Sequence, residues 1–183
     1  MKKIITVSLM ILVSIGIVMI SKQKSGFTIS SSGVKSDGSL SIEYTGEGKG
    51  VSMPLEWTNV PEGTKCFALN LWHYPKPSDP SEVKSYWVLY NIPPDTKNLL
   101  ENVRYVGTLG YNDKDKASYD PMKSKGPGVK EYNVTIYALS EKLIFSKEKV
   151  YRTDLLNAIK GKVLGESTLK YTYETGKTKI KRK

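Results

Sequence analysis

The sequence predicts a mostly β fold with one short helix near the C-terminus. Its 12 tyrosines and 3 tryptophans, together with frequent threonine and valine, favour strands, because aromatic and β-branched side chains pack well on a pleated surface. Apolar and polar residues alternate in several segments, whereas only one segment has a helical period. With 183 residues, 39% of them apolar, the chain has room for one core rather than two.

The first 24 residues differ in character from the rest of the chain. Lys2 and Lys3 precede an uncharged, largely apolar run over 4–20, and a polar spacer follows. This order is typical of an export signal. As a helix the run would span about 25 Å, close to the hydrocarbon thickness of a bilayer, so a retained anchor fits as well as a cleaved signal. We expect 1–24 to be a signal peptide or signal anchor plus spacer, and the protein to be exported, membrane-anchored or extracytoplasmic.

The domain predicted over 25–176 begins with two short alternating segments, 40–44 and 51–57, which we interpret as strands. The glycine-rich stretch 46–50 between them lacks the Gly-Lys-Ser/Thr ending of a phosphate loop and precedes a strand pattern rather than a helix. It is therefore predicted to be a hairpin turn. The further predicted strands are 65–74, 86–92, 131–139 and 163–173.

Side-chain alternation assigns two faces to the strand over 65–74. One face carries Phe67, Leu69, Leu71 and His73, and the other carries Cys66, Ala68, Asn70 and Trp72.

A long loop and a helix complete the predicted elements. The stretch 110–130 is rich in Gly, Pro, Lys and Asp and has no apolar period, and loops of that length are usually functional or mobile. After the fifth strand, Thr153 is the predicted N-cap of a helix and Asp154 lies in its first turn. The helix has an apolar stripe that includes Leu155, and Gly161 is its predicted stop.

The sequence offers no combination of residues for catalysis. The single histidine, His73, and the single cysteine, Cys66, lie seven positions apart on one strand and therefore face opposite sides of the sheet. Neither can activate the other, so Cys66 is expected to be a buried structural thiol. Asp113 and Asp115 alternate with lysines and are interpreted as solvated loop charges. We expect no catalytic residues, no metal site and no cofactor, since no ligand cluster or dinucleotide fingerprint is present.

The formal net charge of +10 comes from lysines scattered along the chain, except in the basic tail over 177–183. We interpret this tail as a solvated segment, with contact to anionic lipid or nucleic acid as the alternative. Nucleic acid is not an expected partner of the domain.

Taken in order, several motifs resemble the phosphatidylethanolamine-binding protein family, in particular its bacterial proteins similar to Raf kinase inhibitor protein. The resemblance covers about 27–173. The residues that carry it are Glu43-Tyr44-Thr45-Gly46-Glu47-Gly48, Pro54-Leu55-Glu56-Trp57, Val60-Pro61-Glu62-Gly63-Thr64-Lys65, Phe67-Ala68-Leu69, Trp87-Val88-Leu89-Tyr90-Asn91-Ile92-Pro93, Tyr132, Tyr137-Ala138-Leu139, Asp154-Leu155-Leu156-Asn157-Ala158, Val163-Leu164 and Leu169-Lys170-Tyr171-Thr172-Tyr173.

The resemblance implies a large antiparallel sheet packed against a smaller one, with a helix near the C-terminus. It also implies a small pocket at the end of the sheet that accepts an anion, such as the phosphate of a phospholipid headgroup. Members of the family are mainly binding and regulatory proteins rather than enzymes.

The implied pocket is altered in this chain. The family has an Asp-Pro-Asp-Ala-Pro run where this chain reads His73-Tyr74-Pro75-Lys76-Pro77, so both acids are absent. The His-Trp pair of the family corresponds to Tyr86-Trp87, and its loop ending in His-Arg-Tyr corresponds to a loop ending in Lys130-Glu131-Tyr132. Both pocket histidines are therefore replaced.

Two interpretations follow from this loss. In the first, His73, Tyr86, Lys130 and Tyr119 form a ligand-binding pocket that is more electropositive than that of the family and holds a small anion or a phospholipid headgroup. In the second, the pocket is vestigial and the domain is an interaction or inhibitor module for a protein partner. A membrane is the further expected partner, through the N-terminal segment. A hydrolase that uses His73 with Tyr86 or Lys130 is disfavoured, because no nucleophile, base and orienting group can be assembled.

Overall fold

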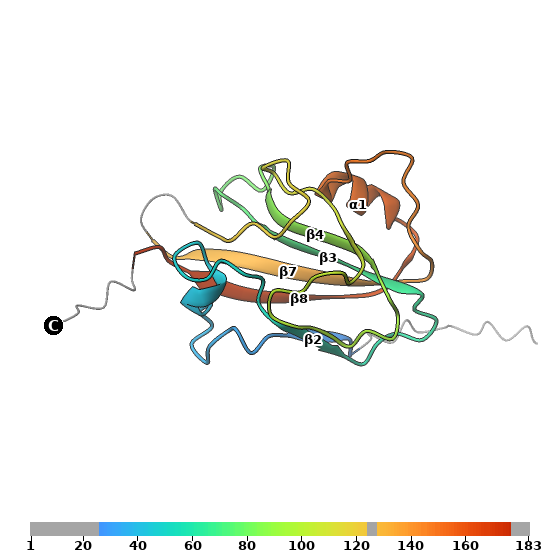
Figure 1. Cartoon of the computed structure of the whole chain (residues 1–183), viewed down its shortest axis with the longest axis horizontal. Coiled ribbons are helices and arrows are strands. Elements are labelled where there is room, and N and C mark those ends of the chain that lie inside the picture. The colour runs from blue at the N-terminus through green and yellow to red at the C-terminus, as the bar shows by residue number, and fades with distance from the viewer. Residues whose placement is uncertain (1–25, 124–127, 177–183) are drawn as a thin grey trace, which may run out of the picture.

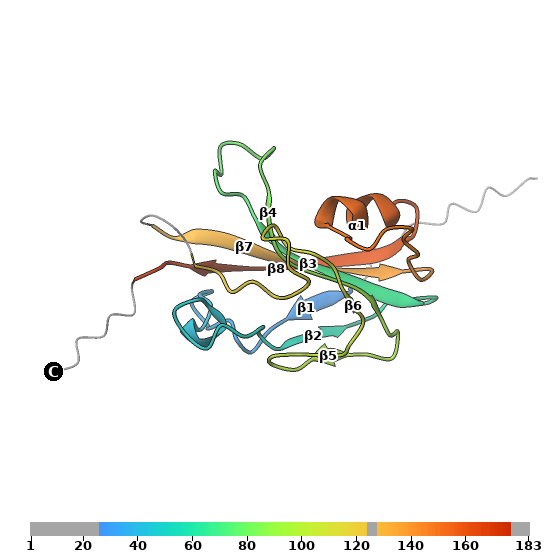
Figure 2. The ribbon, with the colours of Figure 1, turned by 45° about the horizontal axis from the view of Figure 1, so that its top comes forward.

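The computed structural model describes residues 26–123 and 128–176, which form two antiparallel sheets and one α-helix (Figure 1). The larger sheet has the strand order β6-β4-β3-β7-β8 and the smaller one the order β1-β2-β5. Figure 2 shows the smaller sheet on one side of the larger sheet and the helix α1 on the other. The strands and the helix are β1 Thr28–Ser30, β2 Leu55–Thr58, β3 Cys66–His73, β4 Lys84–Ile92, β5 Asn98–Leu99, β6 Thr108–Leu109, β7 Lys130–Leu139, α1 Arg152–Ala158 and β8 Val163–Tyr173.

The predicted alternation of side chains on β3 is confirmed. Phe67, Leu69 and Leu71 are fully buried in the core between the two sheets, where β7 contributes Tyr132, Val134, Ile136 and Ala138. The opposite face of β3 places Cys66 and Ala68 in a second core beneath α1. The mostly β, two-sheet fold with a short helix near the C-terminus is therefore the fold that the sequence predicts.

The helix α1 is held to the large sheet by Leu155, whose side chain is fully buried in the second core. Burial of a leucine side chain contributes about 1.5–3 kcal/mol. The helix begins at Arg152 and its N-cap is Tyr151, so the predicted cap at Thr153 is wrong by two positions. The carboxylate of Asp154 accepts a 2.9 Å hydrogen bond from the backbone N–H of Tyr151, which explains why the helix begins there.

The predicted strand over 40–44 is also wrong, because Ile42–Tyr44 forms a 3₁₀ helix. Leu40 and Tyr44 are both buried, at a spacing that fits one helical turn as well as a strand. The backbone carbonyl of Ile42 accepts bonds from the N–H and the hydroxyl of Thr45. The stretch 46–50 is a turn, as predicted, but it follows this helix and does not join two paired strands.

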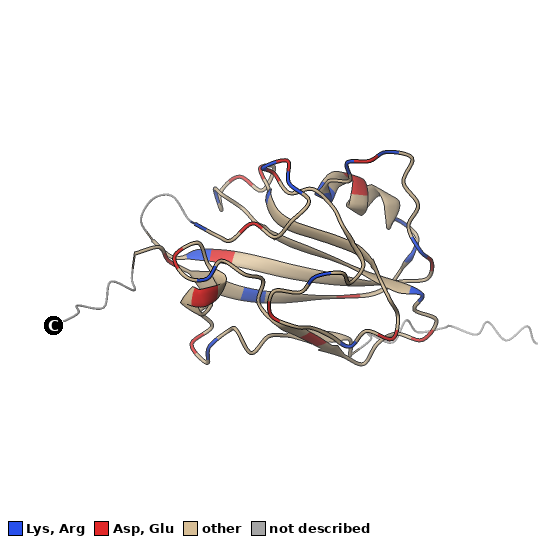
Figure 3. Ribbon diagram, in the orientation of Figure 1, with Lys and Arg blue, Asp and Glu red and all other residues tan. Residues whose placement is uncertain are grey.

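Among the described residues, no helix has the length and apolar character needed to cross a membrane. The predicted signal or anchor over 1–24 and the basic tail over 177–183 lie outside the described residues. Within the domain, positive and negative side chains are interspersed over the loops and strand ends (Figure 3).

Candidate functional site

A cavity of about 550 Å³ lies where the C-terminal end of β3 meets the beginnings of β4 and β7. The rest of its wall comes from the loop after β6, from Pro75 and from Thr175. We call it the His73 cavity. Its lining residues are His73, Pro75, Lys84, Ser85, Tyr86, Asp113, Lys114, Asp120, Pro121, Lys123, Lys130 and Thr175.

The side chain of His73 is buried, with 4% of the residue exposed. Its ring stacks on Tyr132, with ring centroids 4.7 Å apart and an angle of 4° between the planes. Nε2 lies 3.3 Å from the hydroxyl oxygen of Tyr86, whereas Nδ1 is buried and has no hydrogen-bond partner within the described parts of the chain. The pKa of His73 is lowered from 6.5 to about 4, mainly by burial and in smaller part by the positive charges of Lys130 and Lys84. His73 is therefore neutral at pH 7.

A β-bulge directs Tyr86 toward this cavity. Leu71 of β3 pairs with Trp87, and the next residue, Trp72, pairs with Ser85, so Tyr86 is an extra residue in β4. The backbone carbonyl of Tyr86 accepts a 2.8 Å hydrogen bond from the N–H of Asp120. Burial raises the pKa of the Tyr86 phenol well above its usual value, so the hydroxyl keeps its proton.

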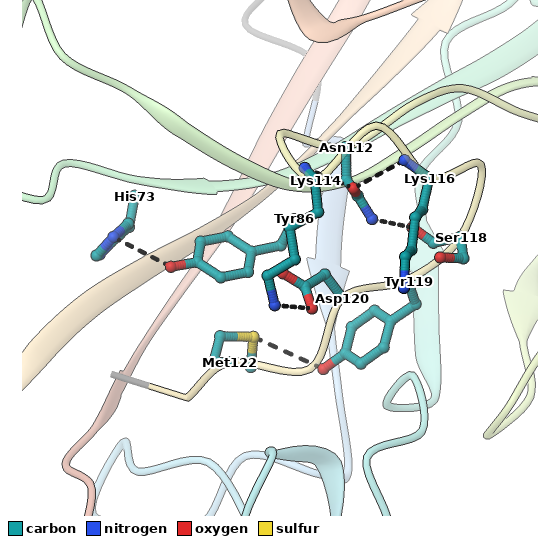
Figure 4. Close-up of polar contacts among 9 residues, drawn as sticks. All are labelled: His73, Tyr86, Asn112, Lys114, Lys116, Ser118, Tyr119, Asp120 and Met122. Atoms are coloured by element: carbon teal, nitrogen blue, oxygen red, sulfur yellow. Dashed lines mark hydrogen bonds and ion pairs between the residues drawn. The ribbon is translucent and has the colours of Figure 1, made fainter. Parts of the chain in front are cut away.

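The loop after β6 is fixed by Asn112, which is only 1% exposed. Its Nδ2 donates to the carbonyl oxygen of Ser118 at 3.0 Å, and its Oδ1 accepts from the backbone N–H groups of Lys114 and Lys116 at 2.9 and 3.3 Å (Figure 4). These bonds close the loop on itself, although it contains no strand or helix. Within the predicted long loop, the segment 112–118 is thus held together by the side chain of Asn112.

Two aspartates of this loop reach the cavity. Asp113 is exposed, as the sequence suggested, but its carboxylate also accepts a 2.9 Å hydrogen bond from the backbone N–H of Ser85. Asp120 pairs with Lys114 at 2.8 Å, and only 15% of its side chain is exposed. Asp115, by contrast, lies on the surface, where it bonds to Lys149 and Tyr151.

The charge of the cavity is positive. Four lysines and two aspartates line it, which leaves a formal excess of two positive charges because His73 is neutral. One aspartate is neutralised by Lys114. The lysines come from different elements: Lys84 begins β4, Lys130 begins β7, and Lys114 and Lys123 belong to the loop.

Three of the four site residues predicted from the sequence line this cavity together: His73, Tyr86 and Lys130. The structure places Tyr119 in the wall of a second cavity, and its hydroxyl donates a 2.6 Å hydrogen bond to the backbone carbonyl of Tyr44. Figure 4 shows Tyr86 directed toward His73 and Tyr119 toward Met122.

The site also contains residues that were not predicted from the sequence: Lys84, Lys114, Lys123, Asp113 and Asp120. Lys84 had a usable signal, since it is the cross-strand partner of His73 in the hairpin formed by β3 and β4. No sequence pattern indicated the loop residues, because their position depends on the hydrogen bonds of Asn112.

The single cysteine does not belong to this cavity. Cys66 is fully buried in the second core, on the far face of the sheet from His73, and burial raises the pKa of its thiol. The described residues contain no group of three or more His, Cys, Asp or Glu side chains that could hold a metal ion.

The chain resembles several known proteins in both sequence and structure. It is 36% identical over 149 residues to a UPF0098 protein of Methanothermobacter thermautotrophicus, an alignment that covers 76% of this chain and 93% of the relative. It is 32% identical over 130 residues to a UPF0098 protein of Aquifex aeolicus, with coverage of 68% and 74%.

Two solved structures share the fold. The phosphatidylethanolamine-binding protein homologue CT736 from Chlamydia trachomatis matches with a TM-score of 0.73 and 26% identity, over 82% of this chain and 98% of its own. Escherichia coli YbcL, described as a member of the mammalian family of these proteins, matches with a TM-score of 0.70 and 23% identity, over 81% and 98%. The family model for phosphatidylethanolamine-binding proteins matches residues 30–174, so this chain belongs to the phosphatidylethanolamine-binding protein family.

Proposed function

We propose that this protein is a non-catalytic binding protein that holds a small anion in the His73 cavity. The ligand we propose is a phosphate group, either free or as part of a phospholipid headgroup. Proteins of this family are generally binding proteins without catalytic activity, and the family membership of this chain supports the same role. The apolar run over 4–20 supports a location at or near the outer face of a membrane.

The observation that carries the proposal is the lysine-rich lining of the cavity. Lys84, Lys123 and Lys130 approach it from three segments that are distant in the sequence. Lysine ammonium groups act as point charges for phosphate and gain strength where water is partly excluded. The volume of about 550 Å³ lies within the range of small-molecule sites.

The contact between His73 and Tyr86 supplies a hydrogen-bond donor as well. A buried N–H without a partner costs more than a buried acceptor without one, so the preferred tautomer of His73 carries its proton on Nε2 and leaves the unpartnered Nδ1 bare. Tyr86 then accepts from Nε2, and its own hydroxyl proton is shared between the neighbouring hydroxyl of Tyr132 and any further acceptor in the cavity. A phosphate oxygen in the cavity is a suitable one.

The proposal is tested by thermal unfolding of the full chain at constant ionic strength. The ligands are inorganic phosphate, phosphoethanolamine, dihexanoyl phosphatidylethanolamine and acetate. A ligand at 100 times its dissociation constant stabilises the folded state by about 2.7 kcal/mol, which corresponds to an increase in Tm of roughly 5–10 °C. A larger shift with the lipid than with inorganic phosphate identifies a headgroup, and equal shifts identify free phosphate.

Two variants and one control locate the site. Lys130→Ala and Lys84→Ala each remove one lining charge and are expected to weaken binding about tenfold. Lys160→Ala removes the same charge from an exposed position beyond the end of α1 and is expected to leave binding unchanged. If no anion shifts the Tm, or if all three variants behave alike, the anion site is refuted and the alternative of a protein-interaction module takes its place.

A further inference from the structure

A second cavity, of about 460 Å³, lies between β4 and the segment that connects β5 to β6. We call it the Trp87 cavity. It shares no lining residue with the His73 cavity. A smaller cavity of about 280 Å³ adjoins it, with Trp87, Val103, Arg104, Tyr105 and Leu109 common to both. The lining residues of the Trp87 cavity are Gly50, Val51, Ser52, Trp87, Asn102, Val103, Arg104, Tyr105, Leu109, Ser118 and Tyr119.

The floor of the Trp87 cavity is aromatic and fixed in place. Trp87 is 3% exposed and meets Tyr119 edge to face, with ring centroids 5.7 Å apart and an angle of 88° between the planes. The hydroxyl of Tyr119 is anchored on the carbonyl of Tyr44 at 2.6 Å. Such a surface is ready to receive an apolar group, because little side-chain freedom remains to be lost on binding.

The connecting segment is anchored at both ends. The backbone N–H of Asn102 donates to the carbonyl of Ser52 at 3.0 Å, and that of Gly110 donates to the carbonyl of Val88 at 2.9 Å. Gly107 has a φ of 70° and packs so closely that a Cβ would lie 2.7 Å from the carbonyl oxygen of Tyr90. The tip between these anchors, over 103–106, forms the rim of the cavity.

Tyr105 at this tip has an unfavourable backbone conformation that no contact with the described residues explains. Its φ is 62°, in the left-handed region, which costs a non-glycine residue roughly 1–2 kcal/mol. Its side chain is nevertheless 99% exposed. Residues in such conformations cluster at active sites, ligand clamps and switch regions, which makes Tyr105 a candidate for contact with a bound molecule.

Arg104 adds a positive charge to the same rim. It is exposed and makes no ion pair or hydrogen bond with any described residue. The lining contains no carboxylate, so the positive charge is not balanced locally. A guanidinium group with open donors binds a carboxylate through two parallel hydrogen bonds.

We propose that the Trp87 cavity binds an amphipathic organic carboxylate, either an aromatic acid or a medium-chain fatty acid. The apolar body lies against Trp87, Val103 and Leu109, the carboxylate pairs with Arg104, and the ring of Tyr105 folds over the bound molecule. The site is independent of the anion site proposed above, because the two have no lining residue in common.

The test is calorimetric titration of the full chain with 3-phenylpropionate and octanoate, each compared with its uncharged amide. We expect saturable binding of one acid per chain, at least tenfold tighter than the amide. If only the aromatic acid or only octanoate binds, that result selects the ligand class. If neither acid binds up to millimolar concentration, or if an acid and its amide bind equally, the proposal is wrong.

Three variants separate this site from the rest of the molecule. Arg104→Gln is expected to lower the affinity for the acid to that of the amide without changing the affinity for the amide. Tyr105→Gly relieves the strained backbone, so a purely structural role would raise the Tm and leave the affinity unchanged; we expect a higher Tm together with a loss of affinity of about threefold or more. Lys130→Ala is the control. If it abolishes carboxylate binding while Arg104→Gln does not, the acid occupies the His73 cavity and the proposal fails.

Discussion

The imidazole ring of His73 lies flat on the phenol ring of Tyr132, with centroids 4.7 Å apart and planes within 4° of parallel. The same histidine contacts Tyr86 through Nε2 at 3.3 Å. This aromatic cluster forms the inner wall of the His73 cavity and keeps the histidine out of water. It therefore controls the protonation of the only histidine in the chain.

His73 is expected to make folding stability depend on pH. In the unfolded chain its imidazole binds a proton near pH 6.5, whereas in the folded chain it does so only near pH 4. Between these values the unfolded state binds more protons, so stability is greatest above pH 6.5 and falls as the pH decreases toward 4. Between pH 7.5 and 5, the share of His73 in this loss of folding stability is about 2 kcal/mol.

Urea unfolding of the native chain and of His73→Phe at these two pH values measures that share. The variant retains the stacking on Tyr132 but has no titrating group, so its loss of stability on acidification should be smaller by about 2 kcal/mol. Equal losses in the two proteins would show that His73 does not titrate differently in the folded state.

Asn112→Ala is expected to destabilise the fold by about 2–3 kcal/mol, because three hydrogen bonds are lost and the part-buried carbonyl of Ser118 loses its donor. The loop that carries Asp120 and Lys114 would also lose its shape, so phosphate binding should weaken. Chemical denaturation and calorimetry measure the two effects. Asn98→Ala, at an exposed position of β5, is the matched control and should change stability by less than about 0.5 kcal/mol.

Gly48→Ala should be more destabilising than its small size suggests. A Cβ at this position would collide with the backbone carbonyl oxygen of Ile42 and with the Cα of Glu43, neither of which can move without unwinding the 3₁₀ helix. We expect a cost of about 3 kcal/mol. Gly38→Ala is the comparison: its φ of 78° is unfavourable for alanine, but its surroundings are open, so about 1 kcal/mol is expected. A similar Tm for the two variants would argue against the close contact.

Cys66 is expected to resist thiol reagents in the folded protein. Its side chain is fully buried and its Sγ lies 3.3 Å from the carbonyl oxygen of Glu141, while burial raises the pKa of the thiol. Reaction with a chromogenic disulfide at pH 8 should therefore be limited by unfolding and should accelerate strongly in urea. Reaction in buffer at the rate of a free cysteine would contradict the burial.

The sequence predicted the long strands well and the short ones poorly. β3, β7 and β8 have 8 to 11 residues, enough for alternation to be distinct from a helical period. The segment 40–44 is too short for that distinction and became a 3₁₀ helix. β5 and β6 have 2 residues each and exist only because a neighbouring strand pairs with them, which no local pattern indicates.

The residues of the candidate site were likewise predictable only in part. His73, Tyr86 and Lys130 follow from the order of the motifs along three strands. The positions of Asp120 and Tyr119 do not, because they depend on how the loop docks on β4. The N–H of Asp120 bonds to the carbonyl of Tyr86, which places Asp120 at one cavity and its neighbour Tyr119 at the other.

The bulge in β4 allows one strand to line both cavities. In a regular strand, two consecutive residues face opposite sides of the sheet. Here Tyr86 and Trp87 both face the core between the sheets, and each forms a wall of a different cavity. Because of this single additional residue, the two cavities share β4 as a wall. Any change that straightens the strand would therefore alter the shape of both cavities.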